Sequence, residues 1–184
     1  MSNLDFSILF PYAGLLPSAL KITMIIGLCG FVLAVIISTV VGSLRSKKLP
    51  KPLSFILTAY VEFFRGTPLL VQVFVVYYGI PAFGIKIDPM VAAIITMGLN
   101  SGAYLSENIR AAIMSVDKGQ YEAAELLGYS PLQTTIHIVI PQAMRIVIPA
   151  FMNGFSSMVK ETSIISVLPV IELTKLGNQV YAKT

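Results

Sequence analysis

The feature that most constrains this chain is a run of 23 residues, Ile22–Leu44, without a charged side chain. As an α-helix at about 1.5 Å per residue, this run is roughly 35 Å long, enough to cross the hydrocarbon core of a bilayer. Only 12% of the residues are charged, against about 25% in an ordinary soluble domain, and the mean hydropathy is +0.80. The composition excludes a disordered chain and a disulfide scaffold, and it indicates a protein whose solvent is largely lipid.

Three further apolar stretches predict an all-α polytopic membrane protein with four spans. The predicted spans cover approximately residues 20–44, 53–79, 90–114 and 134–159. We treat residues 1–184 as one transmembrane domain, because a chain of this length has room for four or five spans. Gly66 and Pro68 interrupt the second span, and a bend is expected there.

The distribution of basic residues predicts the orientation. Four of the 13 lysines and arginines lie between the first two spans, whereas residues 1–21 and 80–89 hold one each. Under the positive-inside rule the loop at 45–51 is cytoplasmic, which places the N-terminus outside and residues 115–133 in the cytoplasm. No cleaved signal peptide is expected. The basic residues neither cover one face nor alternate with aromatic residues, so nucleic-acid binding is not expected.

The cytoplasmic segment 115–133 has strong local signals for two helices joined by a sharp turn. Tyr121–Leu127 is rich in helix formers, and Gly128 is suited to end that helix. Ser130–Gln133 fits a capping box with Pro131 in the first helical position. Ala123 and Ala124 are small, and Glu122 and Glu125 flank them, so we expect a helix that fits a groove on a soluble partner.

Several motifs in order resemble one family. Glu122-Ala123-Ala124, Gly128 and the stretch Ile138–Pro141 resemble the EAA signature of bacterial ABC importer permeases, with Ile140 in place of the usual leucine. Further stretches are similar to the polar amino-acid uptake branch, which comprises the histidine, glutamine, glutamate and arginine permeases: Glu62–Leu70, Ala103–Arg110, Pro141–Arg145 and Lys160–Ser163. The likeness extends over nearly the whole chain.

The resemblance implies a type I ABC importer transmembrane fold in the bacterial inner membrane. It implies a second permease subunit, a periplasmic or lipid-anchored amino-acid-binding protein, and a pair of cytoplasmic ATPase subunits that dock on the EAA helix. ATP and Mg²⁺ belong to those partners, since this sequence has no phosphate-binding loop, and no catalytic activity or bound cofactor is expected of the chain itself. The family usually has a fifth spanning helix after the last segment, and we interpret its absence as truncation.

Two pairs of charged residues have the three-residue spacing of a helical ion pair. Glu62 and Arg65 are expected to pair at the cytoplasmic end of the second span. Glu107 and Arg110 are expected to pair near the inner end of the third span, with substrate contact as the alternative.

Four polar residues are candidates for a substrate pathway. Asn100 lies near the middle of the third span, where a polar group is costly unless it faces a partner helix or a cavity, and Tyr104 shares its face. Glu161 is suited to hold the ammonium of an amino acid, and Ser163 or nearby backbone amides its carboxylate; a Lys160–Glu161 pair is the alternative. His137, the only histidine, has no neighbours at ligand spacing, and no metal site is expected.

The function predicted from these features is that of a transmembrane subunit forming the pathway of an ATP-driven importer for a polar amino acid. The alternatives are an ABC importer for another small solute and, in a different class, a self-contained secondary transporter. A secondary transporter needs coupling carboxylates at mid-membrane, and the candidates, Glu62, Glu107 and Glu161, all lie near predicted span ends. A membrane enzyme is disfavoured because no Ser/His or His/Asp/Glu constellation is evident.

Overall fold

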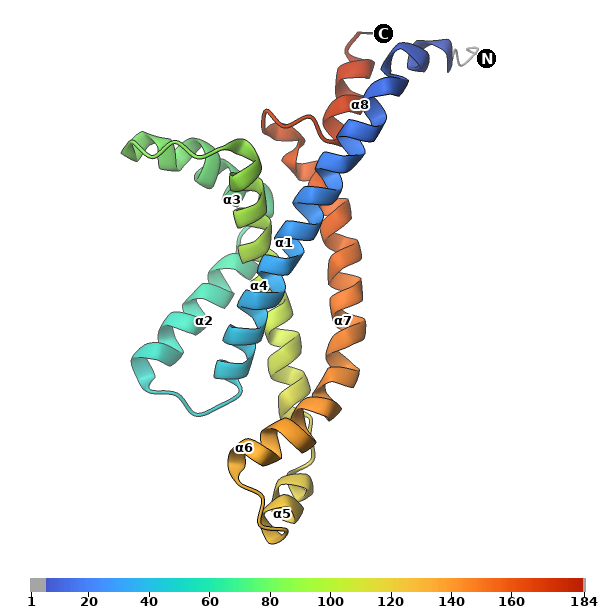
Figure 1. Cartoon of the computed structure of the whole chain (residues 1–184). Helices are drawn as coiled ribbons and strands as arrows, with labels where there is room; N and C mark the ends of the chain where they lie inside the picture. The colour runs from blue at the N-terminus through green and yellow to red at the C-terminus, as the bar shows by residue number, and fades with distance from the viewer. Residues whose placement is uncertain (1–5, 184) are drawn as a thin grey trace.

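The computed structural model describes residues 6–183, and every regular element in this range is helical (Figure 1). The prediction of an all-α chain is therefore confirmed, while residues 1–5, for which no cleavage was expected, lie outside the described range. The α-helices are α1 (Leu16–Arg45), α2 (Lys51–Gly66), α3 (Leu69–Phe74), α4 (Pro89–Met114), α5 (Lys118–Leu126), α6 (Pro131–Thr134), α7 (Ile140–Glu161) and α8 (Leu173–Tyr181). Short 3-10 and π-helical segments extend them at Phe6–Leu15, Val75–Gly79, Ile80–Phe83, Thr135–Val139 and Thr162–Val167.

The core is built on a close parallel contact between α1 and α4. A Cβ atom added at Gly42 would lie 2.6 Å from the Ser106 carbonyl oxygen, and one at Gly98 would lie 2.6 Å from a methyl group of Leu33. Small residues at such positions let two helix backbones approach closely, which is how helices associate where the solvent offers no hydrophobic driving force. The two helices therefore form one scaffold, against which α7 also packs.

The second predicted span is broken in its middle. Helix α2 and the helical segment Leu69–Phe83 are bent by 107° relative to each other, and Thr67 between them is extended, with φ −119° and ψ 144°. Pro68 explains the break, because proline disfavours helical geometry in the residue before it and has no N–H to donate to the Phe64 carbonyl. The expected bend is present. The segment that we predicted as one helix is two helices. Arg65 therefore lies at the break between them and not at the end of a span, where we had expected it.

Two helical stretches of the described chain are long and apolar enough to span a membrane, Pro11–Arg45 and Pro131–Val167. The bent pair makes a third if it counts as one span. Helix α4 matches the predicted third span and has 26 residues, yet it carries the polar residues Asn100 and Ser101 in its middle and is not among these stretches. That the chain crosses the membrane four times remains a prediction.

The C-terminal segment folds back along the first half of α1. The Leu173 N–H donates a hydrogen bond to Thr23 Oγ1 at 3.2 Å, and both ends of the chain lie at the same end of the molecule (Figure 1). Glu172 is fully buried and caps α8, accepting a hydrogen bond from the Thr174 N–H at 2.8 Å. Residues 164–171 are too short to cross a membrane, as expected, and they lead into α8 instead.

Candidate functional site

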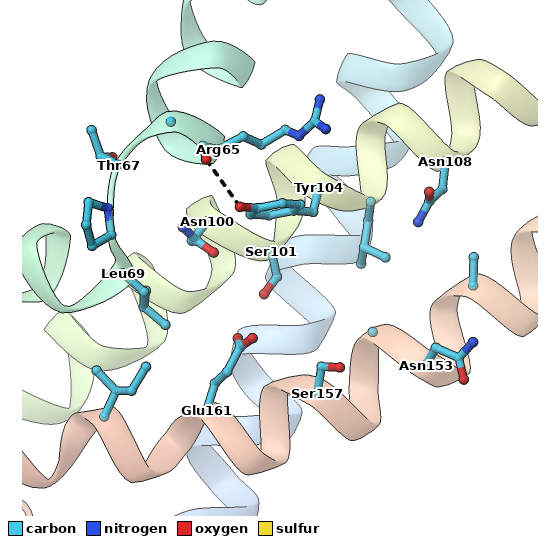
Figure 2. Close-up of a pocket in the computed structure, with 16 residues that line it drawn as sticks. Arg65, Thr67, Leu69, Asn100, Ser101, Tyr104, Asn108, Asn153, Ser157 and Glu161 are labelled. Atoms are coloured by element: carbon cyan, nitrogen blue, oxygen red, sulfur yellow. Dashed lines mark hydrogen bonds between the residues drawn. The ribbon is translucent and has the colours of Figure 1, made fainter.

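A cavity lies at the break between α2 and α3, with a volume of about 770 Å³ (Figure 2). The break forms one wall, the middle of α4 a second, and the C-terminal half of α7 a third. The polar and charged residues that line it are Arg65, Thr67, Asn100, Ser101, Tyr104, Asn108, Asn153, Ser157 and Glu161. A cavity with so many polar groups among long apolar helices indicates a path for a polar solute.

The cavity carries one positive and one negative side chain on different walls. Arg65 is at the end of α2, with its guanidinium carbon 5.4 Å from the centre of the Tyr104 ring. Glu161 projects from α7 on the opposite side of the cavity, and it is half-buried (Figure 2). No ion pair joins either side chain to another group in the described part of the chain. Both charges are therefore available to a bound solute.

Three of the four candidate pathway residues line this cavity. Asn100 and Tyr104 do so from successive turns of α4, and Glu161 does so from α7. Asn100 also makes hydrogen bonds to the Phe64 carbonyl and to Gln72, so the alternative of hydrogen bonding between helices is present for this residue, and its pathway role stays a prediction. The Tyr104 hydroxyl donates to the Arg65 carbonyl at 3.2 Å, which ties α4 to the break.

Ser163 is the exception among these candidates. It is exposed and does not line the cavity, whereas its neighbours Glu161 and Ile164 do. The α-helix ends at Glu161 and continues as a 3-10 helix, whose tighter turn changes the direction in which the following side chains project. This cavity therefore does not include Ser163, and a pathway role for Ser163 stays a prediction.

Sequence reasoning missed a polar stripe on α7. Asn153, Ser157 and Glu161 are spaced four residues apart, so they lie on one face of the helix, and all three line the cavity. This spacing was visible in the sequence. Thr67, Ser101 and Asn108 were also missed, although Thr67 and Asn108 lie in two of the stretches that resemble the family.

The charged residues of α4 form a cluster with the end of α1. Glu107 pairs with Arg110 at 2.9 Å, as expected, and also with Arg45, a partner that the sequence did not indicate because it is 62 residues away. This cluster joins the C-terminal ends of the two scaffold helices.

No ion pair links Glu62 to Arg65 within residues 6–183, so the pairing predicted for them is wrong. Arg65 lies over Tyr104 of α4 at the cavity wall, whereas Glu62 is exposed and outside the cavity lining. The contact with α4 takes the guanidinium away from its helical neighbour.

The segment from α5 to α6 follows the local predictions closely. Gly128 has φ +80°, and the hydrogen bonds from Gly128 N to Glu125 O and from Tyr129 N to Ala124 O, both 3.0 Å, form a Schellman motif. Ser130 and Gln133 make both bonds of the capping box. The turn is thus specified by its own residues, and α5 and α6 project from one end of the helical body (Figure 1).

The exposed surface of this segment differs from the expected one. Ala124 is fully buried within its own chain, so it does not offer a surface to a partner, whereas Glu122, Ala123 and Glu125 are exposed. Three leucines near the turn are instead largely exposed: Leu126 at 89%, Leu127 at 76% and Leu132 at 68%. Apolar side chains gathered at the projecting end of a chain mark an interaction surface.

No group of three or more metal-ligating side chains occurs in the part of the chain that the structure describes. His137 lies in the π-helical segment between α6 and α7, and its Nδ1 is 3.0 Å from the Gln133 carbonyl oxygen.

A broken helix at a polar cavity, long apolar helices beside it and a projecting helix pair define the class: a membrane permease subunit. The chain belongs to the family of binding-protein-dependent transport system inner membrane components, whose model matches residues 30–176. Members of this family are transport subunits of ABC importers and are not enzymes; ATP hydrolysis takes place in a separate subunit.

Curated relatives cover most of the chain. The L-cystine transport system permease protein TcyB of Bacillus subtilis is 38% identical over 169 residues, which are 92% of this chain and 72% of that protein. The arginine transport system permease protein ArtQ of Bacillus subtilis is 36% identical, covering 99% of this chain and 83% of ArtQ. The glutamine transport system permease protein GlnP of Escherichia coli K12 is 34% identical, with 97% and 82% covered.

Two solved structures have the same fold. An amino acid ABC transporter crystallised with histidines matches with a TM-score of 0.89 and 34% identity, covering 97% of this chain and 83% of that one. The inward-facing MetNI methionine ABC transporter matches with a TM-score of 0.79 and 19% identity, over 94% and 83% of the two chains, and at that identity it shows the fold alone. The type I importer fold that the motifs implied is confirmed.

Proposed function

We propose that this chain forms part of the passage for a polar amino acid in an ATP-driven importer, and that the solute passes through the cavity between the break, α4 and α7. The single observation that carries the proposal is the cavity itself, which holds Arg65 and Glu161 on opposite walls, with neither side chain in an ion pair within the described part of the chain. An amino acid has one carboxylate and one ammonium, so its two charged groups match this arrangement.

The roles of the two charges follow from their signs. The substrate carboxylate contacts Arg65, in place of the contact with Ser163 that we first expected, and the ammonium contacts Glu161. Opposite charges attract each other more strongly beside apolar helices, where the effective dielectric constant is lower, than in bulk water. The names of relatives that transport cystine, arginine and glutamine support a polar amino acid as the class of substrate.

The segment from α5 to α6 couples the passage to a separate cytoplasmic ATPase that binds ATP and Mg²⁺. Leu126, Leu127 and Leu132 supply an apolar contact at the projecting end, and Glu122 and Glu125 supply a polar rim. The Schellman turn and the capping box stabilise the turn through bonds among its own residues, and Gln142 of α7 donates a hydrogen bond to Gln120 of α5 at 3.3 Å. Movement of the ATPase subunits is transmitted to α4 and α7 through this segment.

The remaining parts of the importer follow from the family. A second permease subunit, identical or different, completes the passage, and a periplasmic or lipid-anchored binding protein delivers the amino acid. The chain crosses the inner membrane several times with its N-terminus outside, because the basic loop between α1 and α2 is held in the cytoplasm.

Substitution of Glu161 by Gln tests this proposal. Uptake of radiolabelled L-arginine, L-histidine, L-glutamine and L-cystine is measured in proteoliposomes that contain the permease with its ATPase and binding protein. Glu161→Gln removes the negative charge while keeping the side-chain size, so uptake of a transported substrate should fall about tenfold or more while the assembled complex is recovered unchanged.

The matched control is Glu62→Gln, since Glu62 is exposed and lies outside the cavity lining. The control should transport as the unmodified protein does. Normal uptake by the Glu161→Gln variant would contradict the assignment of Glu161, and a wild-type complex that transports none of the four amino acids would contradict the proposed substrate class.

A further inference from the structure

The break between α2 and α3 leaves backbone carbonyls without helical partners. Pro68 has no N–H for the Phe64 carbonyl, and the extended Thr67 leaves its own carbonyl outside the helical ladder. In the hydrocarbon of a membrane an unsatisfied carbonyl is costly, because lipid supplies no hydrogen-bond donor. A donor from elsewhere in the chain is therefore required at this position.

Gln72 supplies that donor. Gln72 is 5% exposed, and the two hydrogens of its Nε2 are shared among three acceptors: the Phe64 carbonyl at 3.0 Å, the Thr67 carbonyl at 3.1 Å and Thr67 Oγ1 at 2.7 Å. One amide group thus reaches back from the first turns of α3 and closes the break. Gln72 itself does not line the cavity.

The same amide determines which way Asn100 faces. Because the Nε2 of Gln72 is directed at the break, its Oε1 is directed at α4, where it accepts a hydrogen bond from Asn100 Nδ2 at 3.0 Å. Asn100 Nδ2 also donates to the Phe64 carbonyl at 3.0 Å. Both amide hydrogens of Asn100 are then used on the side of the break, which leaves Oδ1 for the cavity; Figure 2 shows this oxygen on the cavity side.

We propose that Gln72 is a positioning residue for substrate recognition: it holds the break closed and orients Asn100 so that the cavity presents a carbonyl oxygen that accepts a hydrogen bond from the ammonium of the amino acid. The inference rests on the proposed passage of an amino acid through this cavity and adds a second acceptor to Glu161. The Asn100 oxygen and the Glu161 carboxylate can only accept, and the hydroxyls of Ser101 and Ser157 beside them can accept as well, so this part of the cavity favours a protonated amine over a group that only accepts hydrogen bonds.

The test is equilibrium binding to the purified permease–ATPase complex without the binding protein, using radiolabelled L-arginine, L-histidine, L-glutamine and L-cystine. Gln72→Met keeps the length of the side chain and removes both the donor and the acceptor. Asn100 then loses the partner that orients it, and binding of an amino acid that binds the wild-type complex should weaken about tenfold. The matched control is Glu62→Gln, since Glu62 is exposed on α2 and lies outside the cavity lining; its binding should be unchanged.

A double-mutant cycle separates positioning from a general loss of structure. If Gln72 acts through Asn100, adding Gln72→Met to Asn100→Ala should weaken binding further by less than about twofold. A further tenfold loss in the double variant, or unchanged binding in Gln72→Met alone, would overturn the inference. Binding of none of the four amino acids by the wild-type complex would instead overturn the proposed function.

A measurement on the unmodified complex covers the case in which Gln72→Met does not assemble. N-acetylation of the bound amino acid removes the ammonium and leaves the carboxylate, so the acetylated compound should compete at least tenfold more weakly than its parent. Equal competition by the two compounds would overturn the inference, because the acceptors at Asn100 and Glu161 would then have no role in selection.

Discussion

The close contact between α1 and α4 at Gly42 and Gly98, called the seam below, and the turn between α5 and α6 at Gly128 both depend on glycine, but for different reasons. At Gly42 the backbone is an ordinary helix, and a side chain is excluded because a Cβ would lie 2.6 Å from the Ser106 carbonyl oxygen. At Gly128 nothing lies within 4 Å of the added atom, and glycine is favoured because φ is +80°. The first glycine serves contact between helices, and the second serves the conformation of one residue.

The two uses of glycine belong to two parts of the molecule: the seam to the helical scaffold, and the turn to the proposed docking surface. The seam is buried and joins residues more than 60 positions apart, so damage to it affects the whole helical body. The turn is exposed and stabilised by bonds among neighbouring residues, so damage to it stays local. Substitution of each glycine should therefore give a different kind of defect, and three variants test this.

The largest effect is expected for Gly42→Ala. Even one methyl group meets backbone atoms of α4, which cannot move aside as the end of a flexible side chain can, and overpacking of this kind costs about 1–3 kcal/mol or more. The variant should accumulate poorly in membranes and unfold at lower temperature in detergent. A variant with normal abundance and normal thermal unfolding would show that the seam is not the scaffold.

An intermediate and more selective effect is expected for Gly128→Val. A β-branched residue in the left-handed region costs roughly 1–2 kcal/mol, so the Schellman turn should open and redirect α6. The permease should insert normally but no longer co-purify with its ATPase. Gly128→Asn, which tolerates this conformation better, is the matched control and should retain the ATPase. Retention of the ATPase by the Val variant would contradict docking through this turn.

The smallest effect is expected for Gly177→Ala in α8. Its added methyl group has no atom within 4 Å and its φ is not positive, so neither reason for glycine applies. Alanine in a helix interior is favoured over glycine by roughly 0.5–1 kcal/mol, and the thermal unfolding temperature should stay equal or rise slightly. A clear drop in that temperature would mean that the distinction between the two uses of glycine is incomplete.

Local features were predictable from the sequence because their causes lie within a few residues. The bend at Pro68, the end of α5 at Gly128 and the capping box at Ser130 each follow from one residue type at one position. The Glu107–Arg110 pair is of the same kind, with both partners on one turn of one helix.

Contacts between distant segments were not predictable in this way. Arg45 reaches Glu107, and Arg65 lies over Tyr104 instead of pairing with Glu62, because helix packing brings these groups together. The network of Gln72 and Asn100 depends on the break placing α3 beside α4. The stripe of Asn153, Ser157 and Glu161 was readable as one helix face, yet only packing reveals that this face lines a cavity.

The sequence by itself determined that this is a helical membrane protein, where its helices break and turn, and which importer family its motifs resemble. These conclusions follow from apolar run lengths and from proline, glycine and capping residues, which act over one or two helical turns. Only the tertiary structure decided which polar groups share the cavity and which charged side chains form no ion pair within the described residues. Those depend on how helices far apart in the chain pack, and in lipid that packing follows from small-residue contacts and from the demand that every buried polar group find a partner.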